Sequence, residues 1–532
     1  MFYFLFLYSF VYSFFFGGVI FSFYLFSYSK VEVCLGLVFD YISLGFFSSI
    51  SVITSVVFLY SIYYMSGSFD IRRFGWLVFL FVMSMFLLVF SGNFFFTMLG
   101  WDGLGLSSFC LVIFYSNASS MESGLVTVFM NRVGDVFFLL AFFFFFAVGS
   151  FSWEFFVFYD SLIPLFFILL GAITKSAQAP FSAWLPAAMA APTPVSSLVH
   201  SSTLVTAGVY VVIRFNYMFN FLMGSFLSIL FLLTMVLAGL VANVEMDFKK
   251  IVAMSTLSQL GMMIFVLSMG GMILCFIHMI VHAFFKSMLF LSTGSIMMQI
   301  SGSQDSRIYG GFFFSYSSLV YFFVSCFCLG GFPFLVGFYS KDLIIMSSSL
   351  QLGIFIYYMF IIGCVFTLFY SLRMFLRVYF GFFKNVSYNL FCENFYFSLS
   401  VFLNFFSCWI LGGMFYWFFL LGNVFFVCFF DFMMGLILIG FAFVFYKFLG
   451  FYYFVFVNLC YIYFMKWFSA GGSSFSFKKM SFLSYENSWM ELMGGMGAFY
   501  FLMSSNKSSL LLDGLRLGVV FFISFVFIIY FF

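Results

Sequence analysis

The amino-acid sequence predicts an all-α polytopic membrane protein with about 14–16 transmembrane helices of about 20 residues each. Hydrophobic residues make up 65% of the 532 residues and charged residues only 7%, which leaves too little polar surface to cover a soluble globule. The apolar runs are continuous, whereas a transmembrane barrel needs alternating segments of about ten residues. Two runs are interrupted by glycine and proline beside a lysine, which predicts two inverted helix-bundle repeats with broken helices.

Charge and cysteine content limit the kinds of site that this chain can hold. The 20 Lys and Arg nearly balance the 17 Asp and Glu, without a like-charged run that would indicate a nucleic-acid partner. The ten cysteines are dispersed and form no CxxC pair, which argues against a metal cluster or a disulfide framework. Phosphate-loop and dinucleotide fingerprints are missing from the sequence. We therefore expect no cofactor and no metal in this chain, lipids as its surroundings, and chemistry confined to protons and charge.

The first predicted domain, residues 1–65, consists of N-terminal transmembrane helices at about 2–28 and 34–65. Its first basic residue is Lys30, so the start of the sequence is unlike a signal or transit peptide. The 102 phenylalanines track T-rich codons, as expected of an organellar genome. We therefore expect synthesis inside an organelle.

The second predicted domain, residues 66–380, carries its first membrane charges in two consecutive spans. Asp102 lies in the run GWDGLGL, whose glycines allow close helix approach and would bury the carboxylate. Arg132 and Asp135 are three residues apart, a spacing that lets them pair on one helix face. This pair is either part of a polar path or a purely structural contact.

Residues 171–214, GAITKSAQAPFSAWLPAAMAAPTPVSSLVHSSTLVTAGVYVVIR, form the first broken helix. They hold four of the six prolines together with Lys175 and His200. A lysine at bilayer depth costs about 3 kcal/mol even on a lenient scale, so it should face a protein interior or a wet cavity. The prolines free backbone carbonyls, which a membrane tolerates only where protein or water satisfies them. Lysine and break together indicate a transport site.

A dense charge cluster, EMDFKK, follows at residues 245–250. Glu245 and Lys249 have the i,i+4 spacing in its favourable order, and Asp247 lies between them. A solvated hairpin whose basic residues orient the chain explains this cluster equally well.

His278, His282 and Lys286 are spaced by four residues, so they form one helix stripe that drifts by about 40° per step. Two of the three histidines thus share a face with a membrane lysine. Histidine titrates near neutrality, and burial disfavours the charged form of lysine, so both suit proton exchange near pH 7. The stripe predicts a proton-handling line.

The second broken helix is predicted at residues 330–342, GGFPFLVGFYSKD, where glycine and proline precede Lys341 and Asp342. Two interrupted segments of this kind are typical of an inverted-repeat transporter. Residues 381–465 predict further transmembrane helices. Residues 466–516 predict a lateral amphipathic segment, with a plain loop as the alternative, and residues 517–532 predict a terminal anchor helix.

Several sequence blocks, in order, carry a family resemblance: LYSIYYM (59–65), GWDGLGLSSF (100–109), NRVGD (131–135), KSAQAP (175–180), DFKKIVAMSTLSQLGMM (247–263), HMIVHAFFKSMLFLSTGS (278–295), QDSRIYGG (304–311) and GFPFLVGFYSKDLII (331–345). This set resembles the antiporter-like subunits of respiratory complex I, the NADH:ubiquinone oxidoreductase, which are related to multisubunit cation/proton antiporters. QDSR and the last block favour the subunit 5 family over its sister subunits.

The resemblance implies roles for individual residues. Asp102 is implied as the acidic partner of Lys175 in a switchable pair. A central relay and an exit-side site are implied further along the chain, and the remaining polar positions support the path. In sequence order these residues are Arg132, Asp135, His200, Asp247, Lys249, His278, His282, Lys286, Lys341 and Asp342, with Lys286 at the centre and Lys341 and Asp342 at the exit.

Four features depart from the family pattern. Asp102 replaces a glutamate, Ser182 stands where a histidine is usual, and Ala190 stands where a glutamate is usual. The N-terminal region also offers one span where the family usually has two. The entry side is therefore expected to be less polar than in relatives.

The implied function is proton translocation within the membrane arm of complex I, in the mitochondrial inner membrane. Other membrane-arm subunits are the expected partners, and NADH, FMN, iron–sulfur clusters and ubiquinone are expected on partner subunits. One alternative is a stand-alone cation/proton antiporter, which would share the lysines without needing the lateral segment. Another is a degenerate membrane scaffold, in which the lysines would be dispensable.

Overall fold

The computed structural model describes residues 19–28, 31–67, 70–148, 162–215, 225–300, 302–310, 315–351, 353–381, 395–421 and 437–440. Nine helices in these ranges are long and apolar enough to cross a membrane, so the chain is a multi-pass helical membrane protein, as predicted. The predicted lateral segment (466–516) and anchor helix (517–532) lie outside the described residues. The total of about 14–16 helices stays a prediction.

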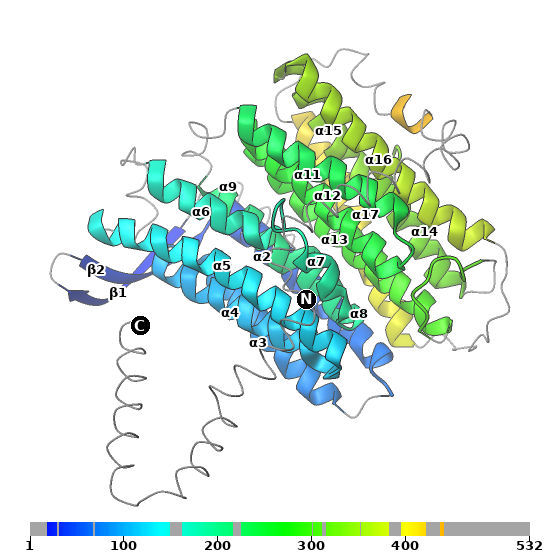
Figure 1. Ribbon diagram of the computed structural model, residues 1–532, viewed down its shortest axis with the longest axis horizontal. Helices are drawn as coiled ribbons and strands as arrows, with labels where there is room; N and C mark the ends of the chain where they lie inside the picture. Colours follow the sequence, from blue (N-terminus) through cyan, green and yellow to red (C-terminus); the bar gives the residue numbers. More distant parts are fainter. Residues whose placement is uncertain are drawn as a thin grey trace, which may run out of the picture. The chain divides into compact units, whose positions relative to one another are not determined.

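The first group of helices leads into the first broken segment (Figure 1). Its members are α2 (Tyr41–Tyr64), α3 (Ile71–Phe90), α4 (Phe94–Val112), η1 (Ile113–Tyr115), α5 (Ala118–Val148) and α6 (Leu162–Lys175). The chain between Lys175 and Arg214 then forms short pieces: α7 (Trp184–Ala187), η3 (Ala188–Ala190), α8 (Thr193–Val195), η4 (Ser196–Thr203) and α9 (Leu204–Arg214). The predicted break in residues 171–214 is therefore confirmed.

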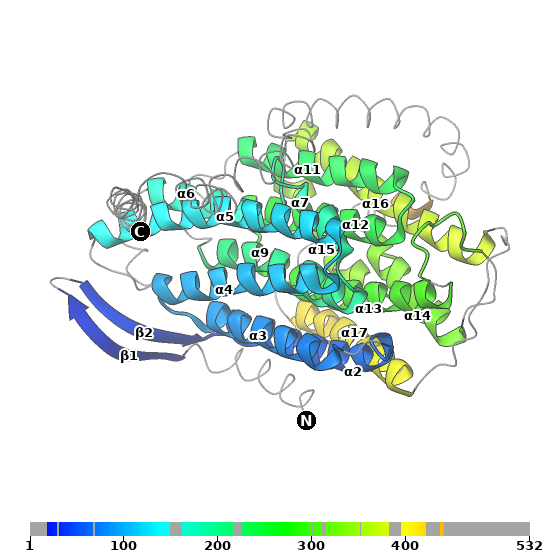
Figure 2. The same ribbon diagram turned by 60° about the horizontal axis from the view of Figure 1, so that its bottom comes forward.

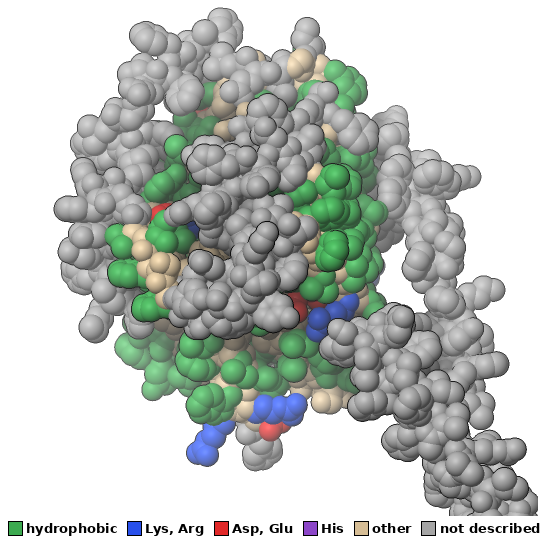
Figure 3. Space-filling model, turned by 90° about the vertical axis from the view of Figure 1, so that its left-hand side faces the viewer, with side chains coloured by type: hydrophobic (Ala, Val, Ile, Leu, Met, Phe, Trp, Pro, Cys, Tyr) green, Lys and Arg blue, Asp and Glu red, His purple; other side chains and the backbone are tan. Residues whose placement is uncertain are grey.

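The second group packs beside the first (Figure 2), and its helices α12 and α13 both contact η4 of the broken segment. Its members are α11 (Ser225–Val244), α12 (Phe248–Ser268), α13 (Met272–Gln299), α14 (Tyr316–Gly330), α15 (Val336–Gln351), α16 (Ile354–Phe380) and α17 (Phe395–Leu421). The second predicted break is also confirmed, since α14 ends at Gly330 and α15 begins at Val336. On the face drawn in Figure 3, most described side chains are hydrophobic and the charged ones gather in a few places.

The N-terminal prediction needs a correction. Residues 19–39 form an antiparallel hairpin of β1 (Val19–Tyr28) and β2 (Val31–Phe39), and helix α2 begins only at Tyr41. The helix predicted at about 2–28 is thus wrong for residues 19–28, while residues 1–18 lie outside the described part. Aromatic and β-branched residues, which favour pleated backbone, make up seven of the ten residues of β1 and four of the nine of β2. Hydropathy alone does not separate such a strand from a helix.

Polar contacts hold the ends of the broken segment and of α11. Arg214, the last residue of α9, forms a 2.7 Å ion pair with Asp40, which caps α2. Arg373 on α16 donates a 2.5 Å hydrogen bond to the carbonyl oxygen of Glu245, just beyond the end of α11. Glu245 and Lys249 do not share a helix face as predicted, because α12 begins only at Phe248 and Glu245 precedes it.

Gly100 allows the closest approach between α3 and α4. A Cβ atom at this position would lie 2.6 Å from the backbone nitrogen of Leu88. Helices that approach so closely in a membrane require a residue without a side chain at the contact.

We expect Gly100→Ala to separate α3 from α4 and to lower the thermal stability of the purified protein by several degrees. Gly75→Ala is the matched control, because Gly75 lies in helix α3 with nothing within 4 Å of its Cβ direction. The control should be neutral or slightly stabilising, since alanine favours helix over glycine. Equal melting temperatures for the two variants would contradict this packing argument.

Candidate functional site

Lys175 is the last residue of α6, and its side chain is fully buried. Its ammonium group donates a 2.6 Å hydrogen bond to the carbonyl oxygen of Trp101 and lies 3.7 Å from the centroid of the Trp101 ring. A cation is favoured at the C-terminal end of a helix and over the face of an indole. The break in the helix therefore supplies a site for a buried positive charge.

Two carboxylates, those of Asp135 on α5 and Asp102 on α4, lie close enough to Lys175 to act on it electrostatically. Asp135 also forms the predicted ion pair with Arg132, at 3.1 Å. Among the ion pairs within 4 Å in the described ranges, none joins Asp102 to Lys175. The implied Asp102–Lys175 pair is thus not in direct contact in this structure, and Asp135 is a second acidic neighbour.

His200 lies in η4, a π-helical turn, and is buried. Its ring lies 6.2 Å from that of Trp184, whose indole donates a 3.0 Å hydrogen bond to the carbonyl oxygen of Thr174. Neither ring nitrogen of His200 has a protein hydrogen-bond partner in the described part of the chain. Buried polar atoms of this kind are candidates for contact with water or with a transferred proton.

The charged residues at the start of α12 separate into two environments. Lys249 is buried and donates a 3.3 Å hydrogen bond to the carbonyl oxygen of Ala191, so it contacts the first broken segment. Asp247 pairs with Lys250 at 2.7 Å, and its side chain is 36% exposed. Of the predicted pair of site residues, only Lys249 therefore belongs to the buried interior.

His278, His282 and Lys286 share one buried stripe of α13, as predicted. Lys286 donates a 2.5 Å hydrogen bond to the hydroxyl oxygen of Ser255 on α12. The rings of the two histidines are 6.4 Å apart, and both nitrogens of His282 lack a protein partner among the described residues. The stripe therefore holds one ammonium and two imidazoles away from lipid.

His278 connects this stripe to the second broken helix. Its Nε2 lies 3.2 Å from the amide oxygen of Gln259 on α12, and its Nδ1 lies 3.0 Å from the hydroxyl of Ser340 on α15. Ser340 directly precedes Lys341. His278 thus joins the stripe on α13 to the residue that precedes Lys341 on α15.

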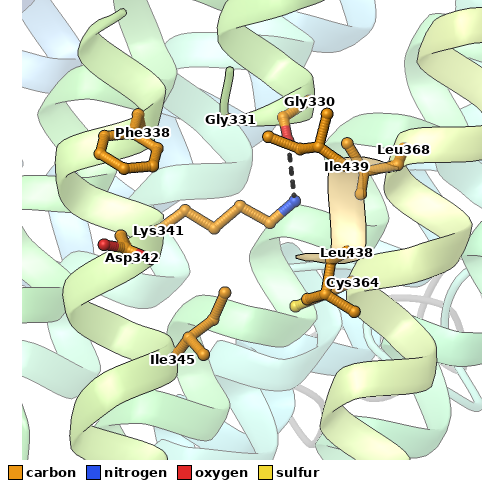
Figure 4. A pocket seen from close by; sticks show the side chains of 10 residues that line it. All are labelled: Gly330, Gly331, Phe338, Lys341, Asp342, Ile345, Cys364, Leu368, Leu438 and Ile439. Carbon is orange, nitrogen blue, oxygen red and sulfur yellow. Dashed lines mark hydrogen bonds between the residues drawn. The ribbon is translucent and has the colours of Figure 1, made fainter. Parts of the chain in front are cut away.

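Lys341 projects into a small pocket beside the second break (Figure 4). Its ammonium group donates hydrogen bonds to the hydroxyl of Thr367 at 2.7 Å and to the carbonyl oxygen of Gly330, the last residue of α14, at 3.4 Å. Asp342 also lines the pocket, and its Oδ1 has no protein partner within the described segments. Here too, the ammonium lies at the carbonyl end of an interrupted helix.

Sequence reasoning missed the neutral residues that hold the charged ones. Ser255, Gln259, Ser340 and Thr367 are all buried, and each bonds a lysine or a histidine of the site. Ser255 and Gln259 lie four residues apart on α12 and so form a polar stripe. In a mostly apolar helix this spacing is a sequence signal that could have identified them. In the residues that the structure describes, no three His, Cys, Asp or Glu side chains gather as metal ligands would.

A helical bundle with buried lysines at two broken helices defines a class of multi-pass membrane proteins with an ionisable interior. The chain belongs to the NADH:quinone oxidoreductase/Mrp antiporter family, whose transmembrane model matches residues 91–367. The model for the N-terminus of chain 5 of NADH-ubiquinone oxidoreductase (complex I) matches residues 25–75. The family expected from the sequence blocks is confirmed.

Relatives named NADH-ubiquinone oxidoreductase chain 5 are similar to this chain. That of Anopheles quadrimaculatus is 46% identical over 65% of this chain and 62% of its own length. That of Anopheles arabiensis is 48% identical over 61% of this chain and 86% of its own length. The chain spans only about three-fifths of the first of these relatives.

Two solved structures share the fold. The Mrp complex from a Dietzia species has a chain that is 23% identical, with a TM-score of 0.68 over 91% of this chain and 57% of that one. A chain of the archaeal membrane-bound sulfane sulfur reductase is 20% identical, with a TM-score of 0.69 over 78% of this chain and 88% of that one. At these identities the likeness establishes the fold alone.

We expect Ser255→Ala to destabilise the protein by about 1–3 kcal/mol, because it removes the hydroxyl that accepts the hydrogen bond from Lys286. The cost should largely disappear in a background that carries Lys286→Met, as a double-mutant cycle of thermal unfolding would show. Ser292→Ala is the control, since the hydroxyl of this buried serine on α13 bonds the carbonyl oxygen of Leu289 in its own helix. A Ser255 effect that is independent of Lys286 would contradict the contact.

Proposed function

We propose that this chain is a proton-translocating membrane-arm subunit of respiratory complex I. The observation that carries the proposal is the hydrogen bond between His278, on the buried stripe of α13, and Ser340, which directly precedes the buried Lys341 on α15. The named relatives support the same assignment. Partner subunits would carry out electron transfer from NADH to ubiquinone.

At the first broken helix, the proton affinity of Lys175 would depend on its distance from the carboxylates of Asp135 and Asp102. Burial disfavours the ammonium form of Lys175, and a nearby carboxylate favours it. Moving Asp135 or Asp102 toward or away from the lysine would thus load or release a proton. Because Asp102 is not in contact with Lys175 here, the structure is compatible with the separated form of the implied switch.

From the stripe on α13 to Lys341 and Asp342, the proton would move by transfers between neighbouring side chains. Lys286, His282 and His278 follow one face of α13, and His278 contacts the hydroxyl of Ser340, the residue before Lys341 and Asp342 on α15. Histidine suits this task because each ring has two nitrogens that can accept or donate a proton. Of the other implied positions, His200 lies within the first broken segment and Lys249 contacts it.

The energy for transport would come from partner subunits. Moving one charge against 100 mV costs about 2.3 kcal/mol, and the sequence offers no redox or nucleotide motif to supply it. NADH, FMN, iron–sulfur clusters and ubiquinone are accordingly assigned to partners, and the mitochondrial inner membrane is the proposed location. Ser182 and Ala190 leave the entry side with fewer polar groups than the family pattern.

Lys286→Met should abolish proton translocation while leaving NADH oxidation and assembly measurable. The physical reason is that methionine keeps the buried volume but cannot hold a proton. Proton-to-electron stoichiometry in sealed membrane vesicles checks this. Lys250→Met is the matched control, because Lys250 is half-exposed and paired with Asp247. Normal stoichiometry in the Lys286→Met variant would exclude the proton relay. It would favour the scaffold alternative, in which the lysines are dispensable.

Co-purification separates this proposal from a stand-alone cation/proton antiporter. A complex I subunit should migrate in native gels within a large assembly that oxidises NADH. Migration as a small free complex that exchanges cations for protons would instead favour the antiporter.

A further inference from the structure

The polar groups bonded to the ammonium of Lys341 are neutral. It donates to the hydroxyl of Thr367 at 2.7 Å and to the carbonyl oxygen of Gly330 at 3.4 Å. None of the ion pairs within 4 Å in the described ranges involves Lys341, although Asp342 follows it in the sequence. A buried cation without a counter-charge is costly. A nearby group that can become negative would therefore stabilise the protonated form of Lys341.

Cys364 is a third polar group at the Lys341 pocket. It lies on α16, its side chain is fully buried, and its sulfur is turned into the pocket (Figure 4). Cys364 and Thr367 are three residues apart, a spacing that places their side chains on one helix face, about 5–6 Å from each other. The thiol therefore lies within one helical turn of the hydroxyl that binds Lys341. The thiol and the ammonium also act on each other electrostatically.

Of the three groups around the ammonium, the thiol is the one that can lose a proton and hold the resulting charge. A backbone carbonyl has no proton to release, and the hydroxyl of Thr367 donates and accepts hydrogen bonds without becoming ionised. A thiol and a lysine amine titrate only about two pH units apart in water. Their proton affinities are thus close enough for a proton to move between them in either direction.

A proton transfer between Cys364 and Lys341 balances within the pocket. The S–H bond of the thiol breaks and a new N–H bond of the amine forms, which leaves a thiolate beside an ammonium. The neutral pair and the ionised pair have the same net charge, so the transfer brings no uncompensated charge into the membrane. The cavity volume of about 20 Å³ leaves room for one water molecule as a bridge.

The ionised pair gives the transfer a direction. While Cys364 is a thiolate, it supplies the counter-charge that Lys341 otherwise lacks. A further proton that reaches the thiolate restores the S–H bond and leaves the ammonium without that counter-charge. Loss of a nearby opposite charge favours the neutral form of a buried lysine. Arrival of one proton at Cys364 would thus favour release of another from Lys341.

We propose that Cys364 is a proton-exchanging residue of the second broken helix, where its thiol passes a proton to and from the amine of Lys341. This inference rests on the proposed function, in that it requires protons to pass through Lys341. The alternative is that Cys364 only fills space, since the apolar residues Ile345 and Leu368 line the same pocket. The two roles differ in which substitutions the position tolerates.

Two substitutions of Cys364 separate these roles. Cys364→Ser keeps the shape of the side chain but removes the titratable proton, whereas Cys364→Asp restores one on a carboxyl group. For a proton-exchanging residue, the proton-to-electron ratio in sealed vesicles should fall in Cys364→Ser to that of Lys341→Met and recover in Cys364→Asp. For a packing residue the order is reversed, because burying a carboxylate costs more than burying a hydroxyl. A Cys364→Ser complex with the wild-type ratio overturns the proposal.

Cys408 provides the matched control. It is a buried free cysteine on α17, and its electrostatic neighbour in the described part of the chain is Cys328. Cys408→Ser should keep the wild-type proton-to-electron ratio. Cys408→Asp measures how much a buried carboxylate alone disturbs this bundle, so recovery in Cys364→Asp can be compared with that cost.

Infrared spectroscopy decides the case in which neither Cys364 variant translocates protons. S–H stretching bands lie in a spectral region free of other protein bands, and the band of Cys364 is the one that the Cys364→Ser complex lacks. In the wild-type complex this band should weaken when NADH oxidation drives protons through the membrane, because part of the thiol becomes thiolate. A band that is unchanged by turnover overturns the proposal.

The two proposals fail separately. A Lys341→Met complex with the wild-type proton-to-electron ratio contradicts the proposed function, because no proton would then need Lys341. A lowered ratio in Lys341→Met together with a wild-type ratio in Cys364→Ser contradicts only the role of Cys364.

Discussion

The constraint on which this structure depends is the cost of holding ammonium groups inside a membrane. Lys175, Lys249, Lys286 and Lys341 are all buried, and each donates to a named oxygen rather than to lipid or to a direct carboxylate partner. Carbonyl and hydroxyl oxygens stabilise a charge without fixing it as firmly as an ion pair would. A lysine held in this way can remain buried and still exchange its proton.

The interrupted segments supply carbonyl oxygens to two of these lysines. An uninterrupted helix uses its carbonyls internally, whereas an interrupted one presents free carbonyls at the bilayer interior. Gly330 ends α14 beside Lys341, and Ala191 lies in the broken segment beside Lys249. The same interruptions would be unstable if they faced lipid, which explains why every residue from Thr193 to Ile213 is buried.

The sequence allowed prediction of the helical membrane fold, both breaks, the stripe on α13 and the Arg132–Asp135 pair, because charge and proline are conspicuous against an apolar background. The hairpin at residues 19–39 was not predictable from hydropathy, since apolar strands and apolar helices have the same composition. Long-range partners such as Trp101 for Lys175 and Ser340 for His278 depend on how helices cross. No spacing within one helix encodes those crossings.

The π turn at Ser196–Thr203 changes which residues of the first broken segment lie on the same face. A π turn holds about one residue more than an α turn, and one residue corresponds to a rotation of about 100°. A helical wheel drawn continuously through this segment would therefore assign Thr193 and Tyr210 to the wrong relative faces. The extra residue rotates the chain that follows it relative to the chain before it. His200 is therefore buried in the π turn, and Tyr210 after it still donates its hydrogen bond to the carbonyl oxygen of Val89.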